Sequence, residues 1–211
     1  MVFDLDGTLV DSRRDIADSA NLLLESCGVD ALPEETIGRM VGDGAPTLVA
    51  RAFAAVGRAL PADALSRFLA IYETRLLEHT RPYPGMDDVL SALGRRVALA
   101  VLTNKPIAST RRILDGLGLA RHFAADAVIG GDGPFPRKPD PAGLLHLIDR
   151  ADVSPISTLM IGDSVIDWRT ARNAATAVCL VRYGFGFEGF PVGELGAGEC
   201  VVDAPGALLE L

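Results

Sequence analysis

The chain has 211 residues, of which 49% are apolar, so it is long enough for one large domain or for a core domain with an insertion. Its formal net charge is −8 and no long basic run occurs, which argues against a nucleic-acid partner because phosphate binding needs a clustered basic face. No apolar run approaches the roughly 18 residues of a membrane span and no signal peptide is recognisable, so we expect a cytoplasmic protein that does not bind membranes.

The first predicted element is a short buried strand with carboxylates at its end. Residues 2–5 are apolar except for Asp4, and Asp6 and Gly7 follow directly. Two carboxylates beside a buried strand cost free energy unless a cation neutralises them or they line a polar cleft. An Asx turn that only closes the strand is the alternative interpretation of the same residues. Only three residues precede Asp4, so we expect the first strand to be shortened, or the true start to lie upstream.

The next block of the chain shows only helical patterns. Apolar residues recur at helical spacing over residues 13–27, and a second helix starts at Pro33. Two further helices are predicted over residues 47–56 and 61–78. The block therefore reads as an all-helical unit.

Two hinges delimit this helical block. We place them near residues 10–13 and 80–84, the second within a cluster of prolines and a glycine. The predicted organisation is a helical cap domain inserted into a core, with the cap formed by residues 13–80 and the core by residues 1–12 and 81–211.

Beyond residue 95 the pattern alternates between short apolar strands and amphipathic helices. Strands are predicted over residues 97–102, 127–129, 158–161 and 177–181, with an edge strand over 199–202. Helices are predicted over residues 106–117, 141–150 and 165–175. This alternation is typical of an α/β fold in which helices cover both faces of a doubly wound parallel sheet, as in Rossmann-like cores.

Polar residues follow three of the predicted strands, and a basic segment precedes a helix. These groups are Asp4 with Asp6 and Thr8, Thr103-Asn104-Lys105, Gly162-Asp163 with Asp167, and Arg137-Lys138. Because the carboxyl ends of parallel strands meet at one edge of a sheet, we expect the groups to converge on one cleft. Each also has an ordinary explanation when taken alone: Lys138 suits a solvated loop, and Asp163 suits a helix N-cap.

The set of motifs resembles that of the haloacid dehalogenase-like superfamily, and the resemblance covers the whole chain. The four motifs of that family are matched in order by Asp4-x-Asp6-Gly7-Thr8, by Thr103, by Lys138 and by Gly162-Asp163-x-x-x-Asp167. The helical block lies where the family inserts its cap. Shorter stretches are similar to the phosphoglycolate phosphatase-like members, namely Asp11-Ser12, Val41-Gly-Asp-Gly44, Thr103-Asn-Lys-Pro106 and Arg137-Lys-Pro-Asp-Pro141.

The resemblance implies a Mg²⁺-dependent phosphatase for a small phosphorylated metabolite, with 2-phosphoglycolate as the first choice. Asp4 would be the nucleophile that forms an aspartyl-phosphate, and Asp6 the general acid and base. The metal would be held by Asp4, the Asp6 main-chain carbonyl and Asp163, and Asp167 would bind it through water or orient Lys138.

The remaining implied roles concern the substrate. Thr103, Asn104 and Lys138 would contact the phosphoryl group, with Thr103 and Lys138 counted as catalytic. Lys105 and Gly44 are candidates for contacts with the rest of the molecule, since Gly44 opens a helix whose amides can face an anion.

Two other functions stay open at this stage. A phosphosugar mutase would use the same aspartyl-phosphate, but the sequence shows no evident sugar-binding aromatic cluster. A non-catalytic interaction module would keep the fold, yet it has no need for clustered repulsive carboxylates. Either a monomer or a homodimer is compatible with the sequence.

Overall fold

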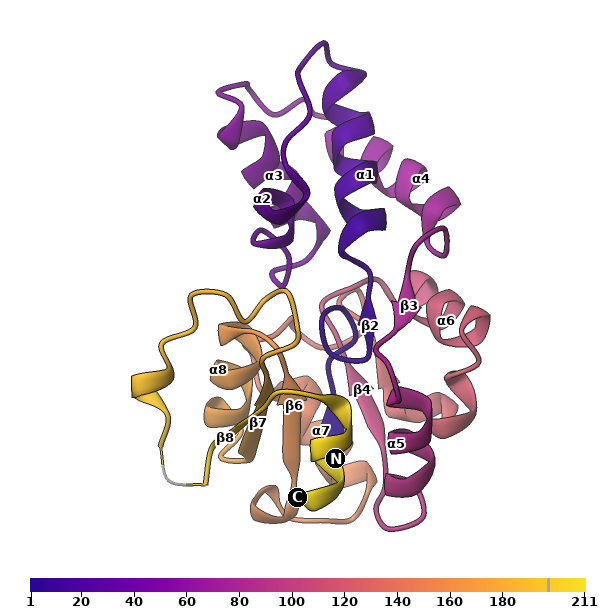
Figure 1. The fold of residues 1–211 in the computed structure, drawn as a ribbon, viewed down its shortest axis with the longest axis vertical. Helices are drawn as coiled ribbons and strands as arrows, with labels where there is room; N and C mark the ends of the chain where they lie inside the picture. Colours follow the sequence, from indigo (N-terminus) through magenta and orange to yellow (C-terminus); the bar gives the residue numbers. More distant parts are fainter. Residues whose placement is uncertain (197) are drawn as a thin grey trace.

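Six parallel strands form the centre of the lower part of the molecule in the computed structural model, which describes residues 1–196 and 198–211 (Figure 1). The strands are β1 Val2–Phe3, β4 Ala100–Leu102, β5 Val128–Ile129, β6 Leu159–Gly162, β7 Ala177–Val181 and β8 Cys200–Val202. Their order is β5-β4-β1-β6-β7-β8, and each neighbouring pair is parallel. The predicted α/β fold with a parallel sheet is therefore confirmed.

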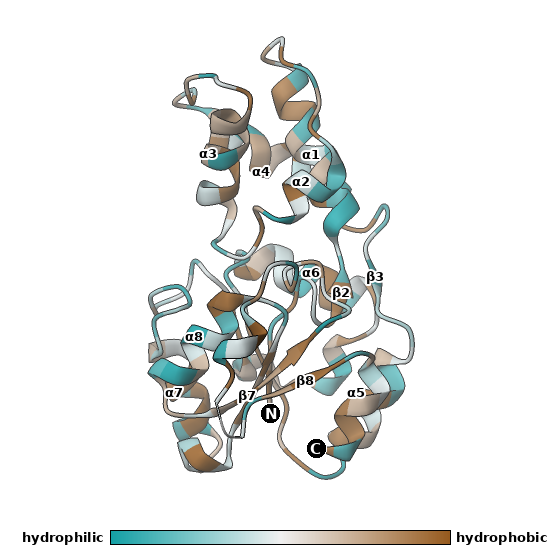
Figure 2. Ribbon diagram, turned by 60° about the vertical axis from the view of Figure 1, so that its left-hand side comes forward, coloured by the Kyte–Doolittle hydropathy of each residue, from teal (hydrophilic) through white to brown (hydrophobic). Residues whose placement is uncertain are grey.

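Helices cover both faces of the sheet, because successive residues of each strand point to opposite faces. Phe3 packs in the cluster that includes residues of α5 (Met86–Leu93) and α6 (Ile107–Gly116), whereas Val2 packs in the cluster with α7 (Ala142–Arg150) and α8 (Val165–Asn173). Figure 2 shows apolar strands at the centre and polar stretches on the outer sides of the helices. The strand that carries Asp4 is thus buried on both faces.

Four helices form a separate group beyond the carboxyl ends of the strands (Figure 1). They are α1 Arg13–Glu25, α2 Glu34–Gly38, α3 Ala45–Ala55 and α4 Ala64–Arg75. Helix α1 contacts the other three, and the fully buried Leu23, Leu24 and Phe53 lie between them. This group, α1–α4, covers the edge of the sheet where the polar strand ends emerge.

The chain leaves the sheet for α1–α4 and returns from it through two short paired strands. Strands β2 (Val10–Asp11) and β3 (Arg81–Pro82) are antiparallel, with Val10 opposite Pro82. Beside them, the fully buried carboxylate of Asp15 accepts hydrogen bonds from the main-chain N–H of Thr80 at 2.8 Å and from its hydroxyl at 2.7 Å. The start of α1 is thereby bound to the segment that follows α4.

Some predicted elements are shorter than expected, and helix α5 and the short strands β2 and β3 were not predicted. Strand β4 begins at Ala100 rather than at residue 97, because residues 94–96 form a turn that follows the unpredicted helix α5. The predicted helix over 61–78 is confined to α4. Among the described residues there are also five short 3₁₀ helices: Ala120–His122, Ala125–Ala127, Pro155–Ser157, Val192–Glu194 and Pro205–Glu210. In the described part of the chain, no helix has the length and apolar character needed to cross a membrane.

Candidate active site

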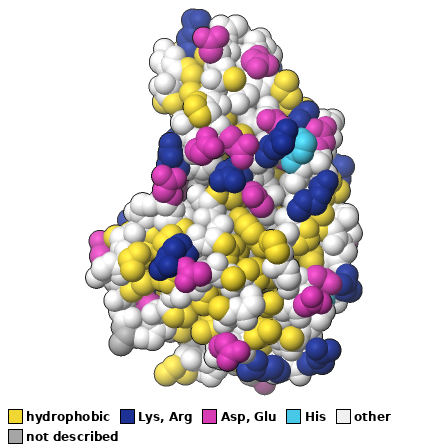
Figure 3. Space-filling model, in the orientation of Figure 1, with side chains coloured by type: hydrophobic (Ala, Val, Ile, Leu, Met, Phe, Trp, Pro, Cys, Tyr) yellow, Lys and Arg dark blue, Asp and Glu magenta, His cyan; other side chains and the backbone are white. Residues whose placement is uncertain are grey.

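A cavity of about 60 Å³ lies between the strand ends and α1–α4. Its polar lining comes from the ends of β1, β4 and β6, and its apolar lining from α1, α3 and α4. The polar residues are Asp4, Asp6, Thr103, Asn104, Lys105 and Asp163, and the apolar ones include Ile16, Leu48, Phe68 and Leu69. Acidic and basic side chains gather between the upper and lower parts of the molecule (Figure 3). Arg39, which follows α2, pairs with Glu188 of the core at 3.2 Å.

Lys138 lies between two of the predicted acidic residues. Its Nζ is 2.9 Å from Asp4 Oδ1 and 2.6 Å from Asp167 Oδ1, and all three residues are buried. Burial disfavours the ammonium, but the charges of Asp167 and Asp4 outweigh it and raise the pKa of Lys138. Burial raises the pKa of Asp4 to about 6, although the charge of Lys138 opposes the shift. A permanent positive charge is thus fixed beside Asp4.

The sequence around Asp167 explains why it can hold Lys138. Asp167 is the third residue of α8, and its Oδ2 accepts hydrogen bonds from the N–H of Ser164 at 3.1 Å and from its hydroxyl at 2.7 Å, which forms a capping box. One carboxylate oxygen therefore starts the helix while the other binds Lys138. The contact with Lys138 that was considered for Asp167 is present, and its contact with a metal through water stays a prediction.

Three carboxylates crowd the end of the sheet without enough positive charge to balance them. Oxygens of Asp4, Asp163 and Asp167 lie within 4.8 Å of one another. Burial, reinforced by the charges of Asp167 and Asp4, raises the pKa of Asp163 well above its usual range. Among the described residues, Asp4 Oδ1 has no donor with hydrogen-bond geometry, although Lys138 is close. Hard oxygen ligands with excess negative charge fit a divalent cation such as Mg²⁺.

Glycines hold Asp163 in place by leaving room for it. A Cβ at Gly7 would lie 1.9 Å from Asp163 Oδ2, and one at Gly184 would lie 2.2 Å from its Cβ, so neither position accepts a side chain without displacing the carboxylate. The main-chain N–H of Gly186 donates to Asp163 Oδ2 at 2.7 Å. The segment after β7 therefore closes around the acidic group.

The side chain of Asp6 lines the same cavity but does not belong to this group of three carboxylates. Both of its oxygens accept hydrogen bonds from Lys105 Nζ, at 2.9 and 2.8 Å, and Oδ1 also accepts one from the hydroxyl of Ser12. A metal contact by Asp6 was expected through its main-chain carbonyl and stays a prediction. Lys105, a candidate substrate ligand, lines the cavity and binds Asp6 and the hydroxyl of Tyr72.

The side chain of Asn104 is occupied by contacts with the protein. Its Nδ2 donates to the main-chain oxygens of Gly42 at 2.8 Å and of Lys138 at 3.0 Å, and its Oδ1 accepts from the N–H of Lys138 at 2.8 Å. Any contact of Asn104 with a phosphate therefore falls to its main chain. Thr103 lines the cavity with its hydroxyl accepting from the N–H of Lys105 at 3.3 Å, and Gly44 lines it at the start of α3.

Sequence reasoning missed Tyr72, Gly184 and Gly186, and it quoted Ser12 only within the stretch Asp11-Ser12, without a role in the site. The two glycines left a signal, because they lie just after β7, at the same edge of the sheet as the other motifs. Tyr72 left none, since its approach to Lys105 depends on how α4 packs against the core.

Comparison with known proteins defines the class of this fold and site. The family model described as haloacid dehalogenase-like hydrolase matches residues 1–181. The chain therefore belongs to the haloacid dehalogenase-like hydrolases.

Individual members of this family that are similar to the chain carry a more specific name. A phosphoglycolate phosphatase of Rhodospirillum rubrum is 45% identical over 206 residues, covering 93% of this chain and 84% of that protein. Another, from Cupriavidus necator, is 37% identical and covers 99% of this chain and 90% of its own length. The crystal structure of a predicted phosphoglycolate phosphatase from Haemophilus somnus superposes with a TM-score of 0.89 at 29% identity, over 99% of this chain and 95% of that one.

Proposed function

We propose that the protein is a Mg²⁺-dependent phosphatase that hydrolyses a small phosphate monoester through a phosphorylated Asp4, with 2-phosphoglycolate as its substrate. The observation that carries the proposal is the meeting of Asp4, Lys138 and Asp163 at one buried site beside the cavity. The names of the relatives support the choice of substrate.

The chemistry proceeds in two balanced steps. A carboxylate oxygen of Asp4 bonds to phosphorus while the bond to the ester oxygen breaks, and that oxygen leaves with the electron pair and takes a proton from Asp6. A water oxygen then bonds to phosphorus while Asp6 accepts a proton from it. The bond between phosphorus and Asp4 breaks, which releases inorganic phosphate and restores the Asp4 carboxylate and the protonated Asp6.

The charges at the site suit this reaction. Lys138 holds its positive charge beside Asp4, where negative charge accumulates as the phosphoryl group moves. Asp4, Asp163 and the Asp6 main-chain carbonyl would hold Mg²⁺, which when bound neutralises phosphoryl oxygens and orients them. The Thr103 hydroxyl and the main chain of Asn104 are the proposed donors to the phosphoryl group.

Helices α1–α4 serve in this proposal as a cap over the core, with residues 13–80 as the cap and residues 1–12 and 81–211 as the core. A closed cap excludes water other than the reacting molecule and defines the rest of the pocket. Its apolar lining, which offers few hydrogen-bond partners for the hydroxyl groups of a sugar, favours a small ester over a sugar phosphate. Gly44, at the start of α3, is the proposed cap contact with the substrate.

The test is turnover with a panel of small phosphate monoesters in Mg²⁺, read as release of inorganic phosphate. We expect 2-phosphoglycolate to have the highest kcat/KM and the Asp4→Asn variant to show only background release. Absence of phosphate release from every ester would refute the proposal. Formation of an isomer of a sugar phosphate, without release of phosphate, would instead identify a mutase.

A further inference from the structure

A buried chain of three polar side chains connects helix α4 with Asp6. The Tyr72 hydroxyl lies 2.7 Å from Lys105 Nζ, which in turn lies 2.9 and 2.8 Å from the two oxygens of Asp6. Tyr72 and Lys105 are 4% and 7% exposed. Such a contact lies in a region of low dielectric, where each hydrogen bond is strong and each missing partner is costly.

The hydrogen-bonding capacity of Lys105 is fully used by this arrangement. A lysine ammonium has three N–H donors, and Lys105 has three acceptors: two oxygens of Asp6 and one of Tyr72. No donor is left for a substrate. The ammonium also lies 4.6 Å from the centre of the Tyr72 ring, which further fixes its position.

The two partners of Lys105 come from different parts of the molecule. Asp6 follows β1 of the sheet, whereas Tyr72 belongs to α4. Lys105 receives the Tyr72 contact only when α4 is packed against the strand ends. The orientation of Asp6 is therefore tied to the position of α4.

We propose that Lys105 and Tyr72 are positioning residues for Asp6. Through Tyr72, the alignment of the Asp6 carboxyl group depends on how α4 packs against the strand ends. The inference rests on the proposed phosphatase function, in which Asp6 protonates the leaving oxygen. Lys105 donates hydrogen bonds to both oxygens of Asp6 and so fixes the rotation of the carboxyl group. Ser12 donates a further hydrogen bond to the same group. Lys105 then acts through Asp6 instead of binding the substrate.

A leaving-group comparison separates positioning from a general structural role. The alkoxide that leaves 2-phosphoglycolate needs a proton from Asp6, whereas acetate leaves acetyl phosphate as a stable anion without one. Acetyl phosphate is a mixed anhydride rather than an ester, but both substrates are small and carry the same phosphoryl group. The quantity to compare is kcat/KM, because it reports the steps up to the first transfer to Asp4 and excludes the later attack of water.

Three variants make the test. For Lys105→Met we expect kcat/KM with 2-phosphoglycolate to fall by about 10- to 100-fold, the lower range for general acid catalysis. For Tyr72→Phe we expect a fall of about fivefold to tenfold, the size associated with one hydrogen bond. With acetyl phosphate both variants should stay within about twofold of the unmodified protein. Tyr83→Phe is the matched control, since Tyr83 packs on Tyr183 with ring centres 4.6 Å apart and does not line the cavity.

The possible outcomes are distinct. If kcat/KM falls equally with 2-phosphoglycolate and acetyl phosphate, or falls with neither, the positioning role is overturned. A raised KM for 2-phosphoglycolate at unchanged kcat in Lys105→Met would overturn it in favour of a substrate contact. If Lys105→Met fails to fold, Tyr72→Phe alone decides. If the unmodified protein releases phosphate from no ester, the proposed function itself fails, which is a different result.

Discussion

Asn104 Nδ2 donates a hydrogen bond across the junction between α1–α4 and the sheet, to the main-chain oxygen of Gly42 2.8 Å away. The same side chain holds the main chain of Lys138 with two more hydrogen bonds. One amide group thus joins the loop that lines the cavity to the loop that carries the buried lysine.

Replacing Asn104 by Ala should lower kcat/KM with the best substrate by about tenfold or more, because misplacement of catalytic groups is costly. Chemical denaturation measures the free energy of unfolding in parallel. We expect the variant to remain folded under the assay conditions, so that unfolding does not account for the fall in kcat/KM. Asn173→Ala is the control, since Asn173 also donates to this loop, at the Pro139 oxygen 2.9 Å away, but from an exposed position. It should cost about 0.5–1.5 kcal/mol of stability and leave turnover unchanged. Equal losses of kcat/KM in both variants would contradict the role given to Asn104.

Mg²⁺ should stabilise the folded protein against heat. A ligand at 100 times its dissociation constant adds about 2.7 kcal/mol to the free energy of unfolding, which corresponds to a rise in Tm of about 5–10 °C at this chain length. Asp163→Asn should remove most of this rise, because it removes a charged ligand from the buried group of acids. Differential scanning calorimetry with and without the metal makes the measurement.

A second acidic group provides the control for this metal test. Oxygens and ring nitrogens of Asp15, Glu78 and His79 also lie within 4.8 Å of one another, but both Asp15 oxygens already accept main-chain N–H groups. Glu78→Gln should therefore keep the full response to Mg²⁺. If Glu78→Gln abolishes the response and Asp163→Asn keeps it, the metal binds elsewhere.

Gly184→Ala should damage the proposed metal site without changing any of the side chains proposed to hold the ion. The added Cβ would lie 2.2 Å from the Cβ of Asp163 and 2.3 Å from the main-chain oxygen of Gly7, so Asp163 or the segment after β7 has to move. We expect Mg²⁺ affinity, measured by calorimetric titration, to fall by about tenfold, as supporting residues around metal ligands usually contribute. Gly193→Ala, where the Cβ meets nothing within 4 Å, should leave the affinity unchanged.

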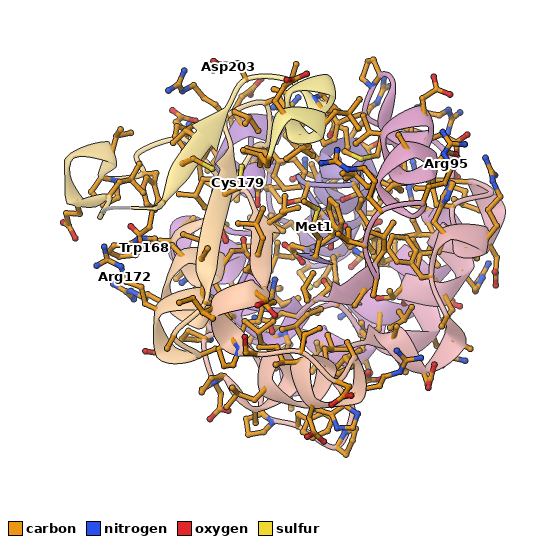
Figure 4. All side chains as sticks on the ribbon, turned by 90° about the horizontal axis from the view of Figure 1, so that it is seen from below. Met1, Arg95, Trp168, Arg172, Cys179 and Asp203 are labelled. Atoms are coloured by element: carbon orange, nitrogen blue, oxygen red, sulfur yellow. The ribbon has the colours of Figure 1, made fainter. Side chains whose placement is uncertain are left out.

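Glu199 should contribute to stability in a pH-dependent way. The hydrogen bond from Arg172 lowers the pKa of Glu199 from 4.5 to about 2, with help from Trp168, whose indole N–H donates at 3.0 Å. Figure 4 shows Trp168 and Arg172 together at one edge of the molecule, where the guanidinium lies 4.0 Å from the indole ring centre. Because the folded-state pKa is depressed, the stabilisation is complete above about pH 4.5 and is lost as the pH falls toward 2.

The variant Glu199→Gln should therefore be less stable than the unmodified protein at pH 7 and should show a shallower loss of stability between pH 4.5 and 2. Urea unfolding across this range measures the difference. Glu194→Gln is the control, because Arg172 contacts only the main-chain oxygen of Glu194. Parallel pH profiles for all three proteins would show that Glu199 does not titrate with this shift.

The sequence was sufficient to predict the elements that carry a periodic pattern. The parallel strands and the grouping of polar residues at their ends followed from apolar runs that stop at Asp4, Thr103 and Asp163. Helix α5 was not predicted, because it directly follows a cluster of prolines that was interpreted as a hinge. Its buried face carries an apolar pattern, formed by Met86, Val89, Leu90 and Leu93.

The partners of individual side chains were less predictable. Asn104 was expected to offer donors to phosphate, yet its amide is saturated by the main chains of Gly42 and Lys138, which lie 62 and 34 residues away in sequence. Lys105 was expected near the substrate; it lines the cavity, and its ammonium binds Asp6 and Tyr72. Long-range pairings of this kind depend on the packing of loops, which leaves no local signature in the sequence.

Strands β2 and β3 lie side by side, so the two ends of the inserted helices are neighbours, with Val10 opposite Pro82. An insertion whose ends meet in this way imposes no length or shape on what lies between them. We expect that inserted domains of other sizes can replace α1–α4 without a change in the strand order of the sheet. Selectivity can then diversify by exchange of whole modules while the reaction centre is inherited intact.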